Sequence, residues 1–406
     1  MGVLVSGASV AGPVVAYWLA RRGVEVTVVE RAPALRKTGG HAVDLFRPAM
    51  DIAERMGVLP RVLERATGTD RMTVHSPGAR PVDLDLHRFF GTLSDRHVEI
   101  MRDDLSEVFF DATRGDVEYV FGDSITSISP EGEVTFERGA PRRFDVVVGA
   151  DGLHSNVRRL VFGEVPEHFV GAYLAVQSLP RRFGRDNHTT CYLRPGKTAA
   201  VYTANHLPDA RAVFLFRGER LDYHYRDTAR QKELLREAFA DVPEVGPWLE
   251  QDGAFYFDSI TQLRLDTWSR DRVTLVGDAA YCPGPAVGGS TSLAVVGAYV
   301  LANELAQALA GHRSDRGDER GLAEAFAAYE REIGDYVRRS RAFALTAARR
   351  LIPSTNRDVW LLRNAGRLLT RLPSPLGRAL MKANGGSLRL HDDVEIKQYP
   401  ELVGQD

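Results

Sequence analysis

The segment VLVSGASVAG, residues 3–12, constrains the fold most, because an apolar, β-branched run leads directly into two glycines. The segment that follows, VVAYWLARRG, has the apolar spacing of an amphipathic helix. A strand, a tight turn and a helix in this order bring free backbone amides and the positive end of a helix to one point, where they can bind a phosphate. We therefore predict a nucleotide-binding βα unit at this position.

Three small residues of this unit match the dinucleotide fingerprint G-x-G-x-x-G, namely Gly7, Ser9 and Gly12. Gly7 allows the tight turn, Gly12 allows the helix to approach the strand, and Ser9 departs from the pattern while adding a hydroxyl donor. The next predicted strand, VEVTVVE, ends at Glu30, where an acidic side chain accepts hydrogen bonds from an adenosine ribose with a free 2′-hydroxyl. This pattern disfavours NADP and leaves FAD and NAD open, with a ligand-free turn as the alternative.

Composition and charge narrow the class of protein. The length of 406 residues and 44% hydrophobic content suit about two to three globular domains. The formal net charge of −2, with no nucleic-acid motif, argues against a nucleic-acid partner. Cys191 and Cys282 lack the paired spacing of a zinc or disulfide framework. We expect a protein of a reducing compartment that acts on small molecules.

Two features bear on location. The first predicted strand begins at Val3, which leaves no room for a secretory signal. The most apolar stretch, residues 291–311, carries Asn303, Glu304 and Gln307, so we expect a buried helix and no membrane span. The sequence predicts a soluble, cytoplasmic protein.

Two distant segments repeat the order of strand, glycine turn and helix. One is FDVVVGADGLHSNVRRLVFG, residues 144–163, and the other is RVTLVGDAAYCPGPAVGGSTSLAVVGAYVLANEL, residues 272–305. Each alone is compatible with a simple turn. Three such units in one chain favour a single dinucleotide site built from remote loops.

The set GASVAG, Glu30, ADGLHSNVRR and GDAAYCPGPAVGGSTSLA resembles the single-component flavoprotein aromatic hydroxylases, the class of para-hydroxybenzoate hydroxylase and the tetracycline-inactivating monooxygenases. The resemblance extends to about residue 330 and implies an α/β fold with a Rossmann-like FAD-binding domain of the GR2 type. It also implies an interleaved β-sheet substrate domain and a C-terminal helical segment. The expected ranges are 1–67, 97–165 and 268–335 for FAD, 68–96 and 166–267 for substrate, and 336–406 for the helical segment.

The resemblance implies that FAD is the cofactor and that it is held by Gly7, Ser9, Val10, Ala11, Gly12, Glu30, Arg31, Arg36, Asp44, Arg102, Asp151, Arg158, Asp278, Pro285, Gly288, Gly289, Ser290 and Thr291. In this assignment Asp278 lies on the ribityl or ribose side, and Asp151 and Arg158 lie near the pyrophosphate and the path of the nicotinamide donor. The loop from Pro285 to Thr291 lines the isoalloxazine, whose negative charge after reduction suits the amides at a helix start.

Some of these assignments have plainer alternatives. Arg102 matches an arginine that contacts the flavin chain, and the alternative is a solvated arginine at a helix start. Arg36 and Asp44 fall on charged positions of a loop that passes the flavin ring, with one residue inserted between them; the alternative is a surface ion pair. The chain also departs from the family at Tyr281 (commonly His), Ser290 (Gly), Ser292 (Asn) and Gly297 (Asp).

The substrate region is predicted from the alternation of apolar and polar residues along the chain. Residues 68–96 and 166–267 alternate apolar and polar side chains, which is typical of half-buried antiparallel strands. We expect a second sheet over the flavin, with a pocket between them. Gln177, Phe214 and Phe216 are the candidate pocket residues, and a position in the core is the alternative for the aromatics.

The sequence contains no metal constellation and no Ser–His–Asp pattern, so a cofactor must carry the chemistry. The resemblance implies a monooxygenase that uses NAD(P)H as transient reductant and O2, and that hydroxylates an aromatic or polycyclic small molecule through a flavin C4a-hydroperoxide, in antibiotic biosynthesis or resistance. An FAD-dependent oxidase or dehydrogenase and an FAD-binding module without turnover stay open. Isolated tryptophans disfavour a halogenase. We expect a monomer or homodimer.

The tail from Tyr336 onward is strongly basic, with eleven basic residues and one acidic residue between Arg338 and Lys382. The spacing in AFALTAARRLI predicts a helix packed along the body of the protein, and LLRNAGRLLTRLP is expected to continue the same face. Binding to a membrane surface is the alternative.

Overall fold

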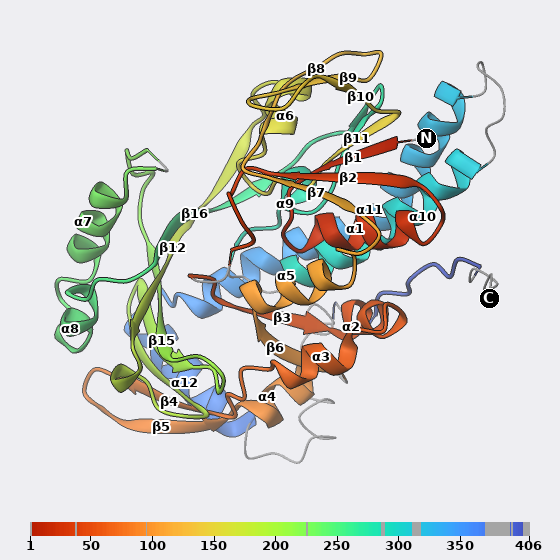
Figure 1. Ribbon diagram of the computed structural model, residues 1–406. Coiled ribbons are helices and arrows are strands. Elements are labelled where there is room, and N and C mark those ends of the chain that lie inside the picture. Colours follow the sequence, from red (N-terminus) through yellow and green to blue (C-terminus); the bar gives the residue numbers. More distant parts are fainter. Residues whose placement is uncertain are drawn as a thin grey trace.

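The computed structural model describes residues 2–36, 39–94, 96–224, 226–285, 289–310, 318–369, 390 and 393–400. Two large sheets organise these residues, with long helices running between and behind them (Figure 1). The α/β fold expected from the sequence is confirmed.

The first sheet has six strands, in the order β17 (Ser269–Arg270), β18 (Val273–Leu275), β11 (Val146–Gly149), β1 (Gly2–Ser6), β2 (Glu25–Glu30) and β7 (Glu118–Phe121). All neighbours are parallel except β17 and β18. The carboxyl ends of the parallel strands meet at one edge, which is where open α/β sheets bind ligands.

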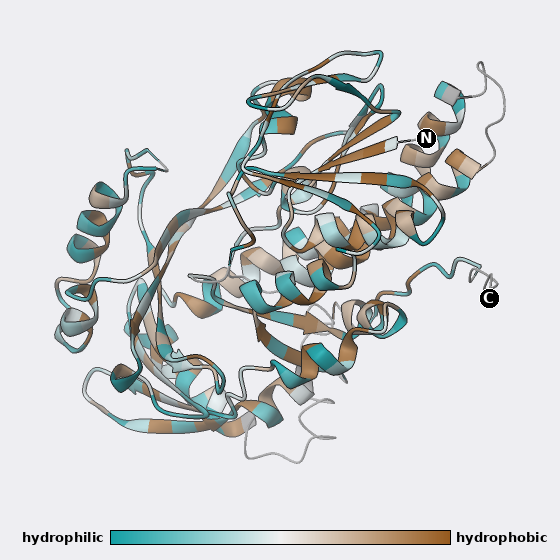
Figure 2. Cartoon of the chain, in the orientation of Figure 1, coloured by the Kyte–Doolittle hydropathy of each residue, from teal (hydrophilic) through white to brown (hydrophobic). Residues whose placement is uncertain are grey.

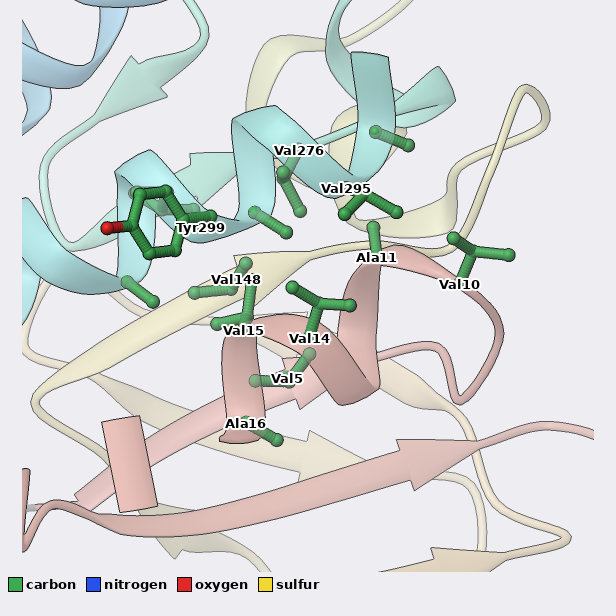
Figure 3. Close-up of a cluster of buried hydrophobic side chains, with 14 of the residues drawn as sticks. Val5, Val10, Ala11, Val14, Val15, Ala16, Val148, Val276, Val295 and Tyr299 are labelled. Carbon is green, nitrogen blue, oxygen red and sulfur yellow. The ribbon is translucent and has the colours of Figure 1, made fainter. Parts of the chain in front are cut away.

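Two helices cover this sheet and form its core. α1 (Ala11–Ala20) packs with α10 (Ser290–Ala310), and Figure 3 shows the shared cluster, to which Val5, Val15, Val148 and Val295 contribute. Within the described residues, α10 is long and apolar enough to cross a membrane by length and composition, but 83% of its apolar window is buried. The expectation of a buried helix is confirmed.

The second sheet has seven strands, in the order β16 (Phe255–Leu263), β12 (Glu167–Pro180), β15 (Asp209–Arg217), β14 (Lys197–Thr203), β13 (His188–Arg194), β4 (Arg71–Ser76) and β5 (Ala79–Asp85). Only β13 and β4 pair in parallel. The helices α7 (Thr228–Ala238) and α8 (Gly246–Leu249) cover one face. The other face meets the ends of α11 (Asp318–Leu351) and α12 (Asn356–Leu369) and the loops of the first sheet.

The remaining elements link these layers. They are β3 (Ala42–Phe46), β6 (His97–Met101), β8 (Ile125–Ile128), β9 (Glu133–Phe136), β10 (Arg142–Arg143), α2 (Arg47–Arg55), α3 (Leu59–Glu64), α4 (Leu86–Leu93), α5 (Arg102–Asp111), α6 (Asn156–Phe162), α9 (Asp278–Tyr281) and the 3₁₀ turns Arg181–Phe183 and Pro243–Val245. In Figure 2, β1 is brown along most of its length, as a strand covered on both faces must be, whereas α7 carries teal residues.

The tail is only partly as expected. Ala344, Ala348 and Ile352 pack on the second sheet, as the spacing of AFALTAARRLI predicts. The expectation that LLRNAGRLLTRLP continues this face holds at Leu362, which packs on the second sheet, and fails at Leu361 and Leu368, which are exposed; residues 370–373 lie outside the described residues. A doublet such as Leu361–Leu362 places its two side chains about 100° apart on a helix, so only one of them packs inward.

Two departures from the family compensate each other. Tyr281 is fully buried, and its hydroxyl accepts a hydrogen bond from Tyr329 Oη at 3.3 Å. A Cβ atom at Gly297 would lie 1.9 Å from the Tyr281 hydroxyl oxygen. The larger residue on α9 therefore requires the glycine on α10. Ser292, a third departure, ties α10 to β3 because its Oγ accepts a hydrogen bond from Phe46 N at 2.9 Å.

The Tyr281–Gly297 contact predicts a coupled pair of substitutions. Gly297→Ala should lower the free energy of unfolding by about 1–3 kcal/mol through overpacking. In Tyr281→Phe the clashing oxygen is gone, so the double variant should lose less than the sum of the two single losses by about 1 kcal/mol. Urea unfolding of the four proteins measures this coupling. Gly334→Ala, where a Cβ would meet only Arg338 Nη1 at 3.5 Å, is the control; additive losses would contradict the prediction.

Candidate functional site

The first glycine turn is closed too tightly for any side chain. Gly7 has φ +109°, and a Cβ atom there would lie 2.5 Å from the Ala150 carbonyl oxygen. A Cβ atom at Gly12 would lie 1.9 Å from the Gly7 carbonyl oxygen. Both positions require glycine for physical reasons, and the turn after β1 is pressed against the residues that follow β11.

The third glycine segment joins the same point. Gly277 has φ +66°, and a Cβ atom there would lie 3.4 Å from the Cβ atoms of Ala11 and Ala294. The turn after β18 thus meets the start of α1 and the first turns of α10. The structure brings the three remote segments together at one edge of the first sheet.

Three polar features lie at this edge of the first sheet: the start of α1, the Arg102 guanidinium and the Glu30 carboxylate. α1 begins after Val10 without a side-chain cap and without an acidic residue in its first turn, so its positive end is not neutralised locally. Arg102 Nη2 donates to Ser9 Oγ at 3.4 Å. Glu30 accepts hydrogen bonds from Ala8 N at 2.9 Å and Ala32 N at 2.8 Å, so its carboxylate stands beside the glycine turn.

Arg102 links this set to the third segment. Burial raises the pKa of the Asp278 carboxyl, and the positive charge of Arg102 opposes that rise. Burial, followed by the same Arg102 charge, lowers the pKa of His41 to about 4. Arg102 is therefore within electrostatic reach of both side chains, and His41 is neutral near neutral pH.

These residues fit FAD. The uncapped start of α1, the turn that excludes a Cβ atom and the Arg102 guanidinium suit a pyrophosphate. The Glu30 carboxylate beside the turn suits the hydroxyls of a ribose, and Asp278 supplies a second acceptor near Arg102.

Asp151 and Arg158 use their polar atoms within the chain. The Asp151 carboxylate caps α6, accepting hydrogen bonds from Asn156 N at 2.8 Å and Val157 N at 3.1 Å. Arg158 Nη1 donates to the Ala279 carbonyl oxygen at 3.0 Å, which ties α6 to α9. These contacts hold two of the three segments together, and a direct contact of either side chain with a cofactor stays a prediction.

The other predicted residues are distributed around this edge. Arg31 is exposed directly after β2. Burial raises the pKa of Asp103, and Arg36 is close enough for its charge to oppose that rise. Gly289 and Ser290 lie at the start of α10, where the Gly289 carbonyl oxygen accepts a hydrogen bond from Leu293 N at 2.9 Å. Pro285 precedes this start and Thr291 follows it in the first turn, whereas Gly288 lies outside the described residues.

The predicted substrate residues lie on the face of the second sheet that α7 and α8 cover, and a contact of any of them with substrate stays a prediction. Phe214 and Phe216 pack with residues of α7 and α8, and neither side chain is more than 4% exposed. Gln177 lies on this same face and donates to the Gln251 carbonyl oxygen. Alternation groups residues that share a face, but it does not tell which face turns toward the flavin-side loops.

The face that does meet these loops contacts residues 40–42, which lie between Arg36 and Asp44 in the loop predicted to pass the flavin ring. Gly40 N donates to Asp103 Oδ2 at 2.7 Å, and the Gly40 carbonyl oxygen accepts from Arg211 Nε at 3.1 Å. Ala42 N donates to Tyr202 Oη at 2.7 Å. We call residues 40–42 the clamped segment, because α5 holds it from one side and the second sheet holds it from the other.

The clamped segment brings His41 to Tyr256 on β16. Their rings stack with centroids 6.2 Å apart and an interplanar angle of 30°. Arg102 and Asp278 both act on the Tyr256 hydroxyl, whose pKa is raised mainly by burial. We call the pair His41 and Tyr256 the aromatic seam. His41 lies in the loop predicted to pass the flavin ring but was not singled out in it, and no motif marks Tyr256.

Tyr256 continues into a hydrogen-bonded bridge. The Tyr256 hydroxyl donates to Asp258 Oδ2 at 3.2 Å. Asp258 Oδ2 also lies 2.9 Å from Nε2 of His154, in the ADGLHS segment. The hydrogen bond to Asp258 raises the pKa of His154. This bridge joins the second sheet to the second glycine segment.

Asp44 belongs to a carboxylate pair. It lies opposite Glu99 in the β3–β6 ladder, and its Oδ1 is 2.7 Å from His97 Nε2. Burial and the neighbouring Asp44 charge raise the pKa of Glu99 to about 7. Glu99 therefore gains or loses a proton near neutral pH.

The geometry around Arg102 predicts its effect on cofactor affinity. Arg102→Ala should weaken FAD binding by about tenfold to a hundredfold, because a charge-assisted hydrogen bond contributes about 1.5–3 kcal/mol. Titration of the apoprotein with FAD, followed by flavin fluorescence, measures the affinity. Arg114→Ala, beyond the other end of α5 and with a side chain that is 67% exposed, should bind FAD as wild type does. An unchanged affinity in Arg102→Ala would remove this residue from the site.

The Asp44–Glu99 pair predicts a pH dependence. Because the pKa of Glu99 is raised from 4.5 to about 7 on folding, the folded state retains a proton that the unfolded state loses, and stability falls as pH rises through this window. Glu99→Gln abolishes the titration, so above pH 7 its free energy of unfolding should exceed that of wild type by about 1 kcal/mol. Urea unfolding across this pH range tests the effect, with the exposed Glu64→Gln as control; a pH-independent difference would refute it.

Comparisons with known proteins agree with this geometry. Residues 1–326 match the FAD binding domain family. The chain is 42% identical over 358 residues to an uncharacterized protein of Mycobacterium tuberculosis, covering 84% of this chain and 91% of the relative. It is 36% identical over 312 residues to a flavin-dependent monooxygenase of Legionella longbeachae, covering 75% and 80%. The crystal structure of tetracycline destructase Tet(55) is similar, with a TM-score of 0.79, 29% identity and 98% coverage of both chains. The chain belongs to the FAD binding domain family and is an FAD-dependent monooxygenase.

Proposed function

We propose that this monooxygenase consumes NAD(P)H and O2 and hydroxylates an aromatic or polycyclic small molecule. In the balanced reaction one oxygen atom enters the substrate and the other leaves as water, while NAD(P)H and a proton supply the two electrons and the hydrogen. FAD, when bound, supplies the oxygen activation, which side chains alone do not provide. The task of this chain is to hold the reactants, orient the target carbon and exclude water.

We assign the cofactor to the edge where the three glycine segments meet. The start of α1 and Arg102 would hold the pyrophosphate, Glu30 a ribose, and Asp278 the ribityl side. We further propose that residues 1–67, 97–165 and 268–335 form the FAD-binding domain. Residues 68–96 and 166–267 would then form the substrate domain, and residues 336–406 the C-terminal helical segment.

The observation that carries the substrate class is the aromatic seam. His41 and Tyr256 stack where the second sheet meets the flavin-side loops, within electrostatic reach of Arg102 and Asp278. A neutral imidazole and a phenol ring offer flat, weakly hydrated faces, which stack on a planar ring at low desolvation cost. The likeness to tetracycline destructases supports a polycyclic substrate.

A labelled-oxygen experiment tests this proposal. The purified holoenzyme is screened with phenols and polycyclic aromatics for stimulated NAD(P)H oxidation, and the products are analysed by mass spectrometry after reaction under ¹⁸O2. We expect one labelled oxygen atom in the product. Tyr256→Ala should release more hydrogen peroxide per NAD(P)H consumed, because loss of the ring admits water to the seam. Unlabelled oxidised product formed with stoichiometric peroxide would instead identify an oxidase, and unlabelled oxidised product formed without peroxide would identify a dehydrogenase.

A further inference from the structure

The helix α12 has apolar side chains on two opposite sides. On its inner side, Val359 and Leu362 pack with Val74 and Leu193 of the second sheet. On its outer side, Trp360 is 59% exposed, Leu361 47% and Leu368 55%. Leu361 and Leu368 are seven residues apart, or about two turns, so they share one side, and Trp360 lies next to Leu361. We call these three residues the outer face of α12.

This outer face is unusual for the molecule. Among the described residues only Leu63 and Leu351 are also exposed large hydrophobic side chains, and Leu351 closes α11 just before α12 begins. An amphipathic helix needs one apolar side to pack on its own domain, and α12 already has that side. The second apolar side adds nothing to the packing on the sheet.

Exposed basic residues precede the outer face along the chain, and Arg357 lies one helical turn before Leu361 on the same side of α12. Arg349 and Arg350 end α11, and Arg357 lies in the first turn of α12, all three exposed. The one acidic residue of α12, Asp358, accepts hydrogen bonds from Thr355 N and Thr355 Oγ1 and so stabilises the helix start. The chain as a whole has a formal charge of −2, so the excess of basic residues between 338 and 382 is local.

We propose that the outer face of α12 docks the protein on the surface of an anionic lipid bilayer. A helix with an apolar side that contains tryptophan and a basic rim lies in the plane of the interface, with its apolar side chains among the acyl chain ends. Arginine side chains extend toward the headgroups, and each basic residue near the surface adds attraction to anionic lipid.

Charge decides between a bilayer and a second copy of this chain. In a two-fold dimer the same patch meets itself, which would bring the arginines of one copy against those of the other. An anionic surface turns the same arginines into attractive contacts. The proposal concerns peripheral binding and does not depend on the substrate or the reductant.

The test uses the full holoenzyme and vesicles of phosphatidylcholine with or without phosphatidylglycerol. We expect flotation with the anionic vesicles, loss of flotation in high salt, and a blue shift of Trp360 emission, isolated by difference from Trp360→Phe. The triple variant Trp360→Ser, Leu361→Ser, Leu368→Ser should lower the partition coefficient by about tenfold or more. Leu63→Ser, a change at an equally exposed leucine (48%) on α3, should bind as wild type does.

Flavin content and circular dichroism show whether each variant folds. The double variant Arg350→Gln, Arg357→Gln tests the role of charge separately, because it leaves the apolar side chains of the outer face unchanged. It should lose its preference for anionic vesicles. The proposal is overturned if wild type does not float with anionic vesicles, or if the triple variant floats equally well. It is also overturned if Trp360 emission is already blue-shifted without vesicles, because the chain itself or a second copy would then cover the face.

Discussion

The absence of space for a side chain at the carboxyl edge of the first sheet is the constraint on which the rest of the structure depends. At Gly7 and Gly12 a Cβ atom would overlap backbone oxygens, and at Gly277 it would touch α1 and α10. This close approach lets three segments from distant parts of the chain meet. The start of α1 has no side-chain cap and no acidic residue in its first turn, so its backbone amides can bind an anionic cofactor.

The second sheet takes part in the candidate site because its residues contact the segments at this edge. Arg211 and Tyr202 hold one side of the clamped segment, and Asp103 on α5 holds the other. Both attachments use backbone atoms of residues 40–42, so the position of His41 is fixed by two layers at once. The bridge from Tyr256 through Asp258 to His154 adds a second connection between the layers. We infer that such double attachment keeps the aromatic seam closed to water, as oxygen-inserting chemistry requires.

The sequence was most informative where backbone geometry limits the choice of residue. The βα turn from Gly7 to Gly12 and the acid at Glu30 could be predicted because few residue types fit there. The residues that line the substrate site could not be predicted, because alternating apolar and polar residues do not show which face of a sheet turns toward the cofactor. Gln177, Phe214 and Phe216 face α7 and α8. Tyr256 and Glu99 belong to no motif, and their environment, like that of His41, arises only when separate layers pack together. The Tyr281–Gly297 pair shows the same limit, since two departures that look independent in sequence fill one space.

A crystal structure of the protein with FAD bound would show each of the proposed cofactor contacts. We expect the pyrophosphate at the start of α1 beside Arg102, a ribose within hydrogen-bond distance of Glu30, and the isoalloxazine next to the Tyr256 ring. An isoalloxazine bound away from the aromatic seam, or a pyrophosphate without contact to the first glycine turn, would contradict the proposed contacts.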